Sequence, residues 1–252
     1  MITVTARRCL KSLTGIRKFT KRNPAKLRMS FENRLLAALP EQESQRLLPE
    51  MEQVTLGFNE VLYQPGERIK QVYFPNKGLI ALTSPANERS TTAVNLIGND
   101  GMTGICIFLG EAVLPTPMIV LVAGAALKMK ASVLRKESLN GSLERLLRRY
   151  TMTLLTQSRQ VTICNHFHKI YARLCCWMLY ISDAAESDGF LMTHKLLSNM
   201  MGVRREEVSK AATALQQDQL ISYSRGYVTI LNRAGLKAVS CECHRISKRR
   251  TQ

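Results

Sequence analysis

The sequence predicts an α+β protein in which a small antiparallel β-domain is followed by a long helix and then by a compact unit of two short helices and a hairpin. Short β-rich segments separated by turn residues occupy about residues 50–130. A helical pattern without proline follows Ala131, and helix and hairpin signals recur together between Leu191 and Leu231.

Two short helices are expected before the β-domain, with Pro40 between them. Their apolar residues recur at helical spacing and are Phe31, Leu35, Leu36, Leu39, Leu47 and Leu48. The expected strands are Val54–Phe58, Val61–Tyr63, Val72–Phe74, Leu79–Thr83, Thr91–Ile97 and Met118–Val122. We assign residues 30–135 to this domain, which the spacing of its turns predicts to be an antiparallel sandwich or barrel.

The chain is strongly basic. It has 36 Lys and Arg against 19 Asp and Glu, a formal charge of +17, which favours polyanionic partners, nucleic acid first and an anionic membrane second. Residues 1–29 form a basic leader without acidic residues, and residues 246–252 a basic tail. The leader could be a DNA-touching arm, a transit peptide, a disordered tail or the product of an upstream start codon before Met29; we prefer the last two.

The composition of the chain also indicates the cellular compartment in which the protein works. No apolar run reaches the roughly 18 residues of a spanning helix, and the longest, Met118–Leu127, contains Gly124. Seven cysteines at irregular spacing, with no secretory signal before them, indicate a reduced cytoplasm. We therefore expect a cytoplasmic protein without a membrane partner.

One stripe of the long helix, at residues 136–168, has the steps of three and four that are typical of a coiled coil. The pattern also fits one side of a buried helix in a monomer. We prefer a homodimer, because Arg148, Arg149 and Arg159 suit a solvated flank and a polar seam residue such as Gln157 can fix the register. The expected seam residues are Leu147, Tyr150, Leu154, Gln157, Val161 and Cys164.

The segment at residues 169–245 has the strongest local signals. Thr193 is a good N-cap for a short helix, and Gly202 suits the tight corner after it. A second helix is expected from about Arg204, with Val208, Ala211, Ala212 and Leu215 on its inward face. Leu220–Tyr223 and Tyr227–Leu231 flank Ser224-Arg225-Gly226 as a hairpin. The pattern predicts a winged helix-turn-helix.

The outward face of the second helix holds groups that read bases and bind phosphate. An arginine fork can pair with guanine, a carboxylate can accept from cytosine, and Ser or Lys can hold the backbone. The candidate DNA-binding residues are Arg204, Arg205, Glu206, Ser209, Lys210, Thr213, Thr193 and Arg225.

The runs Leu196–Val208, Leu215–Leu220 and Tyr223–Ile230 resemble the DNA-binding domain of the cyclic-AMP receptor protein/FNR (Crp/Fnr) superfamily of bacterial transcription regulators. The resemblance covers about residues 31–245 and is specific only in the C-terminal third. It implies a β-roll like those that bind cyclic nucleotides, a dimerisation helix, an inverted-repeat operator and RNA polymerase as a partner. It places the family's reading pair on Arg205 and Glu206.

The resemblance is incomplete in the sensor. Related cyclic-nucleotide sensors have a Gly-Glu pair for the ribose and an Arg for the phosphate, whereas this chain has Gly104-Ile105-Cys106 and no Arg from Thr91 to Lys130. Cyclic AMP is therefore disfavoured. An iron–sulfur cluster is also disfavoured, because only Cys9 lies near the N-terminus. The effector and any cofactor stay unknown.

Two cysteine and histidine groups, Cys241–His244 and Cys164–His168, contain metal-ligand types, but neither has the usual zinc spacing and we expect no metal site. No Gly-rich phosphate loop, nucleophile elbow or metalloprotease motif is present, so we expect no enzyme. The alternatives to a DNA-binding regulator are a ligand-binding module and a non-specific basic protein that binds nucleic acid or a membrane surface.

Overall fold

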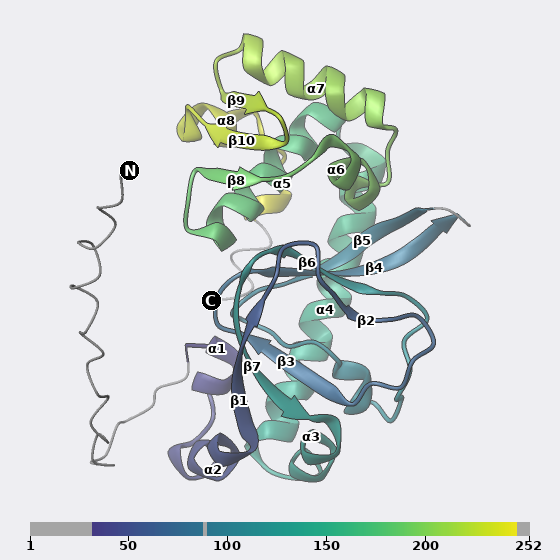
Figure 1. The fold of residues 1–252 in the computed structure, drawn as a ribbon, viewed down its shortest axis with the longest axis vertical. Coiled ribbons are helices and arrows are strands. Elements are labelled where there is room, and N and C mark those ends of the chain that lie inside the picture. The colour runs from purple at the N-terminus through teal and green to yellow at the C-terminus, as the bar shows by residue number, and fades with distance from the viewer. Residues whose placement is uncertain (1–31, 88–89, 246–252) are drawn as a thin grey trace, which may run out of the picture. The chain divides into compact units, whose positions relative to one another are not determined.

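The computed structural model describes residues 32–87 and 90–245 (Figure 1). Phe31, the basic leader and the basic tail named above lie outside the described residues. Helices α1 (Arg34–Ala37) and α2 (Glu41–Leu47) come first and are separated at Pro40, as predicted. Asn33 caps α1 and also donates hydrogen bonds to Pro75 O and Gly101 O, at 2.7 and 3.0 Å, which joins these helices to the β-domain.

The predicted antiparallel β-domain is confirmed as a roll of two sheets, with strand orders β1-β7-β3 and β2-β6-β4-β5. Its strands are β1 (Met51–Leu56), β2 (Val61–Tyr63), β3 (Gln71–Pro75), β4 (Leu79–Asn87), β5 (Ser90–Ile97), β6 (Met118–Val122) and β7 (Gly124–Lys130). The expected strands stop at Val122, but the run Met118–Leu127, which Gly124 interrupts, is short enough to be a pair of buried strands, and β6 and the first part of β7 occupy it. A Cβ atom at Gly124 would lie 2.1 Å from Lys77 O, so glycine is required for the close passage of these two segments.

Helices α3 (Ala131–Glu137) and α4 (Ser142–Phe167) follow the roll, and α4 lies behind the strands in the view of Figure 1. One face of α4 is buried in the same apolar core as the roll, through Leu143, Leu147, Tyr150 and Leu154. Two hydrogen bonds fix the helix: Tyr150 Oη donates to Met102 O at 2.9 Å, and Asn95 Nδ2 donates to Leu154 O at 2.9 Å. Polar groups in this interface are therefore paired.

This packing corrects the predicted dimer seam. Leu147, Tyr150 and Leu154 pack against the chain's own roll, Gln157 accepts a hydrogen bond from Asn95 at 3.3 Å, and Val161 and Cys164 line a cavity between the roll and the helices. The periodicity correctly indicated one buried stripe, but the stripe meets the same chain. The apolar residues of the opposite face, Met152, Leu155 and Ile163, are 55%, 48% and 47% exposed. We call these three residues the outer stripe.

The C-terminal unit comprises α5 (Ile170–Ala185), β8 (Gly189–Leu191), α6 (His194–Met201), α7 (Arg205–Gln217), β9 (Ile221–Ser224), β10 (Tyr227–Ile230) and α8 (Arg233–Val239). Helix α5 packs inside this unit, where Leu174, Met178 and Ile181 are buried. The three-stranded sheet has the order β8-β10-β9. Sequence reasoning missed β8 and α8, which are too short to show a clear period.

The C-terminal unit packs directly on the roll. Leu79, Ala81, Ala93 and Leu121 of the roll belong to the same apolar cluster as α5, α6 and α7. Thr92 Oγ1 on β5 donates a hydrogen bond to Met200 O at the end of α6, at 3.0 Å. Within the described part of the chain, no helix is long and apolar enough to cross a membrane.

Candidate functional site

Helices α6 and α7 meet at the predicted corner. Thr193 Oγ1 accepts a hydrogen bond from Leu196 N at 3.1 Å and so caps α6. Gly202 ends α6 in the left-handed conformation, with φ at 64°, and its N–H donates to Asn199 O. The inward stripe of α7 is buried as predicted: Val208, Ala211, Ala212 and Leu215. The corner is therefore built from local signals that the sequence contains.

Arg204 is the N-cap residue of α7, although its guanidinium cannot accept a hydrogen bond. Glu207 takes over part of this role, because its Oε2 accepts from Arg204 N at 2.9 Å. This is one half of a capping box. The Arg204 side chain is left exposed beside the first turn of the helix.

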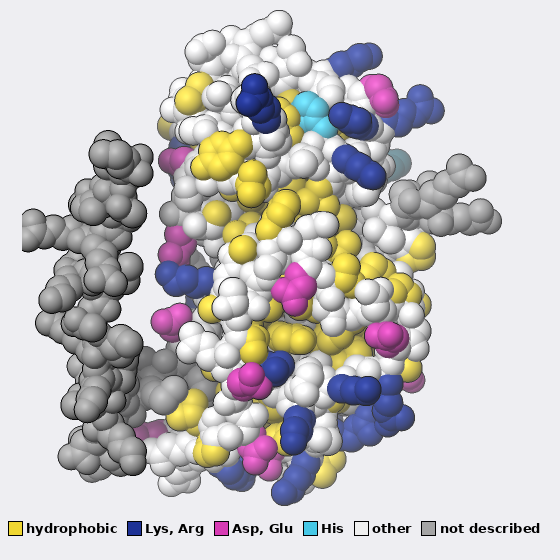
Figure 2. Space-filling model, in the orientation of Figure 1, with side chains coloured by type: hydrophobic (Ala, Val, Ile, Leu, Met, Phe, Trp, Pro, Cys, Tyr) yellow, Lys and Arg dark blue, Asp and Glu magenta, His cyan; other side chains and the backbone are white. Residues whose placement is uncertain are grey.

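The first turns of α7 present charge to solvent. Arg205, Glu206, Lys210 and Thr213 are all exposed, as Arg204 is. Figure 2 shows Lys and Arg side chains gathered in the upper part of the view, where Figure 1 places α6 and α7. Among the described residues, no acidic group forms an ion pair with the cations at 204, 205, 210 or 225. These charges are available to an external anion.

Ser209 is placed differently from the other candidates. Its hydroxyl is half-buried and lies 2.8 Å from His194 Nδ1, on the first turn of α6. The His194 ring stacks on Tyr223 of β9, with ring centroids 4.4 Å apart, and Tyr223 Oη donates to Met192 O at 2.6 Å. Sequence reasoning missed His194, since a single histidine after an N-cap gives no periodic signal. The contacts join both helices to the hairpin.

The hairpin of β9 and β10 has a two-residue turn at Arg225 and Gly226, with φ values of 49° and 81°. Two consecutive residues with positive φ match the turn that fits the twist of a β-hairpin. The turn exposes Arg225. It also lies close to α6, because a Cβ atom at Gly226 would be 3.3 Å from Thr193 Cγ2. The wing, defined as β9, this turn and β10, thus lies beside the start of α6.

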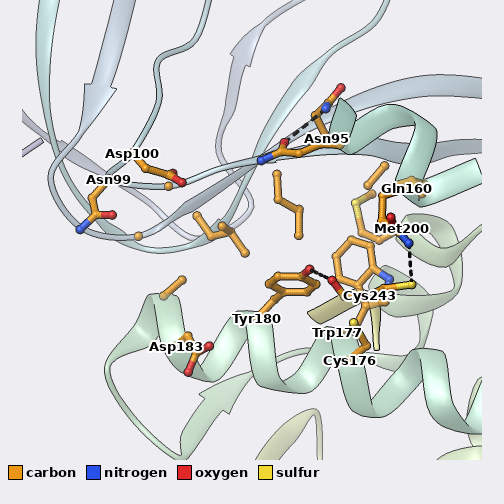
Figure 3. A pocket seen from close by; sticks show the side chains of 18 of the residues that line it. Asn95, Asn99, Asp100, Gln160, Cys176, Trp177, Tyr180, Asp183, Met200 and Cys243 are labelled. Atoms are coloured by element: carbon orange, nitrogen blue, oxygen red, sulfur yellow. Dashed lines mark hydrogen bonds between the residues drawn. The ribbon is translucent and has the colours of Figure 1, made fainter. Parts of the chain in front are cut away.

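A cavity of about 400 Å³ lies between the roll and the helices α4 and α5 (Figure 3). The roll contributes Asn95, Asn99 and Asp100 to its wall, and α5 contributes Trp177 and Tyr180. Burial raises the pKa of Asp100. The cavity combines aromatic faces with amide and carboxyl groups, a composition suited to a small polar ligand.

The interior of the roll is filled near Gly104–Cys106, the segment at which the family resemblance led us to look for a ribose-binding pair. Gly104 precedes a short 3-10 helix, and a Cβ atom there would lie 2.8 Å from Val72 Cγ1. Tyr63 Oη lies 2.6 Å from Thr103 Oγ1 and 3.0 Å from Gln71 O, and burial raises the pKa of this tyrosine.

The structure joins the two cysteine and histidine groups that the sequence analysis treated separately. Cys164 and His168 at the end of α4 lie beside Cys241 and Cys243, which follow α8, and their ligand atoms are all within 4.8 Å of one another. Four residues of the two groups therefore form one cluster in the structure. Sequence spacing could not reveal the combination, because a tertiary contact brings together segments that are 77 residues apart.

Residues 172–239 match the family model of the Crp-like helix-turn-helix domain. A Crp/Fnr-family transcriptional regulator from Eubacterium rectale superposes with a TM-score of 0.65 at 13% identity, over 82% of this chain and 98% of that one. FixK2 from Bradyrhizobium japonicum superposes with a TM-score of 0.61 at 14% identity, over 76% of this chain and 98% of that one. A CRP/FNR-family regulator from Thermus thermophilus superposes with a TM-score of 0.62 at 18% identity, over 75% of this chain and 98% of that one.

No curated protein sequence matches the chain. The matches show the Crp/Fnr fold, in which a β-roll, a long helix and a Crp-like helix-turn-helix domain follow one another.

The environment of His194 predicts a pH dependence of stability. Burial, and then the nearby Arg205 cation, lower the pKa of His194. The unfolded chain therefore protonates this histidine more readily, so the free energy of unfolding should fall as the pH falls from about 7.5 through the ordinary histidine pKa of about 6.5. Urea unfolding at several pH values should show that the free energy of unfolding falls less steeply with falling pH in His194→Gln than in the wild-type protein. Parallel curves for the two proteins would refute this assignment.

Proposed function

We propose that this chain, which combines the Crp/Fnr fold with a Crp-like helix-turn-helix domain, is a transcription regulator that binds a specific duplex DNA sequence as a homodimer and responds to a small molecule. The main support is the exposed first turn of α7, whose cations have no acidic partner among the described residues. The proposed target places the protein in the cytoplasm, with RNA polymerase as a further partner. The structural neighbours are regulators rather than enzymes.

The exposed groups of α7 have separate proposed roles. The planar fork of Arg205 suits guanine O6 and N7, and Glu206 can accept a hydrogen bond from cytosine N4. Lys210 and Arg204 are exposed and are assigned to phosphates beside these base contacts, and the exposed Thr213 extends the same proposed interface. Ser209 supports this face indirectly, because its hydroxyl is occupied by His194.

The wing and the start of α6 extend the proposed interface. Arg225 projects at the exposed turn of the wing, and Thr193 lies next to that turn. A cation at this position can contact a neighbouring phosphate while α7 lies in the major groove. Contacts of this kind fix the register of the protein on the duplex without reading sequence.

The outer stripe is the proposed dimer surface. Met152, Leu155 and Ile163 lie on the face of α4 that the roll leaves exposed. At 100° per residue, Leu155 lies 60° from Met152 and Ile163 only 20°, so the three residues can form one seam. Pairing two α4 helices about a two-fold axis would present two α7 helices, and Crp-like dimers read half-sites about 34 Å apart. An inverted-repeat operator follows.

The cavity between the roll, α4 and α5 is the proposed effector site. A molecule bound there would contact Asn95 on β5 together with Trp177 on α5, and so would bridge the sensor roll and the DNA-binding unit. A ligand shifts an equilibrium between two arrangements only if it binds one of them better. A site whose walls belong to both units would meet that condition, because its shape would differ between the two arrangements.

The first test changes the proposed base contact. Arg205→Ala should reduce the preference for the selected operator over random duplex by about 1–3 kcal/mol, because one bidentate base contact is lost. Competition binding at fixed salt measures this preference, and Lys237→Ala, an exposed cation on α8, is the matched control. Equal loss of operator and random binding in Arg205→Ala would favour a non-specific basic protein.

The second test concerns the dimer. Met152→Glu combined with Leu155→Glu should shift the protein towards the monomer, because four added carboxylates would face one another across the two-fold seam. Analytical ultracentrifugation measures the change. Thr153→Glu, one residue along and a quarter turn away, should leave the association intact. A dimer that persists in the double variant would remove the outer stripe from the interface.

The third test uses Trp177, the single tryptophan of the chain, as a probe of the cavity. A small molecule that changes operator affinity should also change Trp177 emission, because it would replace water against the indole. Both responses should saturate over the same ligand concentrations. Effectors that alter DNA affinity without any change in emission would place their site elsewhere.

A further inference from the structure

We propose that Cys164, His168, Cys241 and Cys243 bind a single Zn²⁺ ion that joins the end of α4 to the segment after the DNA-binding domain. These four residues are called the thiol–imidazole cluster. Three thiols and one imidazole form one of the common ligand sets of structural zinc sites. The two pairs come from different parts of the chain, so an ion bound here would be a tertiary cross-link.

The distances in the cluster fit one tetrahedral ion. All four ligand atoms lie within 4.8 Å of one another. Cys164 Sγ is 3.7 Å from Cys241 Sγ, and Cys243 Sγ is 3.4 Å from His168 Nδ1. A tetrahedron with Zn–S bonds of about 2.3 Å has an S···S edge of about 3.8 Å, and a Zn–N bond of about 2.0 Å makes the mixed edge shorter. Only small side-chain shifts are needed to admit an ion.

The backbone places each pair of ligands without strain. Cys164 and His168 are four residues apart at the C-terminal end of α4, so they lie one above the other on the same face. Cys241 and Cys243 are two residues apart in the segment after α8, where Cys241 N donates to Ala172 O at 3.3 Å. That hydrogen bond holds the segment against α5.

Neighbouring groups supply the outer contacts that orient metal ligands. Gln160 Nε2 donates to Cys243 Sγ at 3.2 Å, and Tyr180 Oη donates to Cys243 O at 3.1 Å, as Figure 3 shows. Cys241 and Cys243 are 7% and 4% exposed. A buried sulfur atom that accepts a hydrogen bond from an amide N–H, as Cys243 Sγ does from Gln160, fits a thiolate that binds a cation better than it fits an apolar core residue.

A single ion explains the arrangement better than a disulfide or an iron–sulfur cluster. A disulfide between Cys164 and Cys241 would not account for the positions of Cys243 and His168, whose ligand atoms lie beside the same two sulfur atoms. A cluster of several irons needs its ligands spread around a larger body. Convergence of four ligand atoms on one small space is the feature that distinguishes a mononuclear site.

The position of the site suggests its consequence, which rests on the proposed function. The cluster spans the junction between α4 and α5, and Cys164 and Cys243 also line the cavity. Zn²⁺ bound here would hold α4 and the DNA-binding unit in one arrangement and so set the position of both α7 helices. Loss of the ion would loosen that arrangement next to the proposed effector site.

The test measures metal in the full-length protein purified under reducing conditions. Elemental analysis should give one zinc per chain, and replacement by Co²⁺ should give the intense visible bands of tetrahedral thiolate coordination. Cys241→Ser and His168→Ala should weaken zinc affinity by more than about tenfold, the scale at which even outer-shell partners act. Cys106→Ser, a free cysteine in the roll outside the cluster, is the matched control and should bind one ion.

His168→Cys gives a variant that keeps the proposal testable if other changes prevent folding, because four thiolates still form a zinc site and should retain one ion. Substoichiometric zinc in the reduced wild-type protein, or an unchanged affinity in both Cys241→Ser and His168→Ala, would overturn the proposal. A Cys164–Cys241 disulfide in rapidly alkylated protein would do the same. Metal content is measured without DNA, so its outcome is independent of whether the chain recognises an operator.

Discussion

The two faces of α4 determine the rest of the architecture. Its inner face is buried on the roll, and three buried leucines, at about 1.5–3 kcal/mol each, make its detachment costly against a typical domain stability of about 5–15 kcal/mol. The hydrogen bonds from Tyr150 to Met102 and from Asn95 to Leu154 fix the rotation of the helix about its axis. Because that rotation is fixed, the outer stripe is left exposed on the face away from the roll, and the end of α4 meets the segment that follows α8.

The same packing brings three features together at one junction. The cavity, the thiol–imidazole cluster and the contact between Thr92 and Met200 all lie where the roll meets the DNA-binding unit. Thr92 bonds directly to the last turn of α6, which precedes the corner into α7. Short, packed contacts therefore connect this junction to the corner before α7. This arrangement supports the proposal that a ligand or an ion at the junction controls the spacing of two α7 helices.

The sequence predicted the DNA-binding unit well because its signals are local. Thr193, Gly202 and the inward stripe of α7 act within a few residues of their own positions, and the wing needed only a two-residue turn. The seam prediction failed for a physical reason: periodicity identifies the buried face of a helix but not the surface that covers it. The contact of His194 with Ser209 and the thiol–imidazole cluster depend on tertiary packing. No short-range pattern encodes such contacts.

The proposed function requires a symmetric pair of chains to hold two α7 helices in successive major grooves of one duplex. Hydroxyl-radical footprinting of the bound operator examines that geometry most directly. Such a complex should give two protected patches on one side of the DNA, related by an inverted repeat and centred about 10–10.5 base pairs apart. A single continuous patch without symmetry would contradict this geometry. Protection without a fixed position on the operator would contradict it as well.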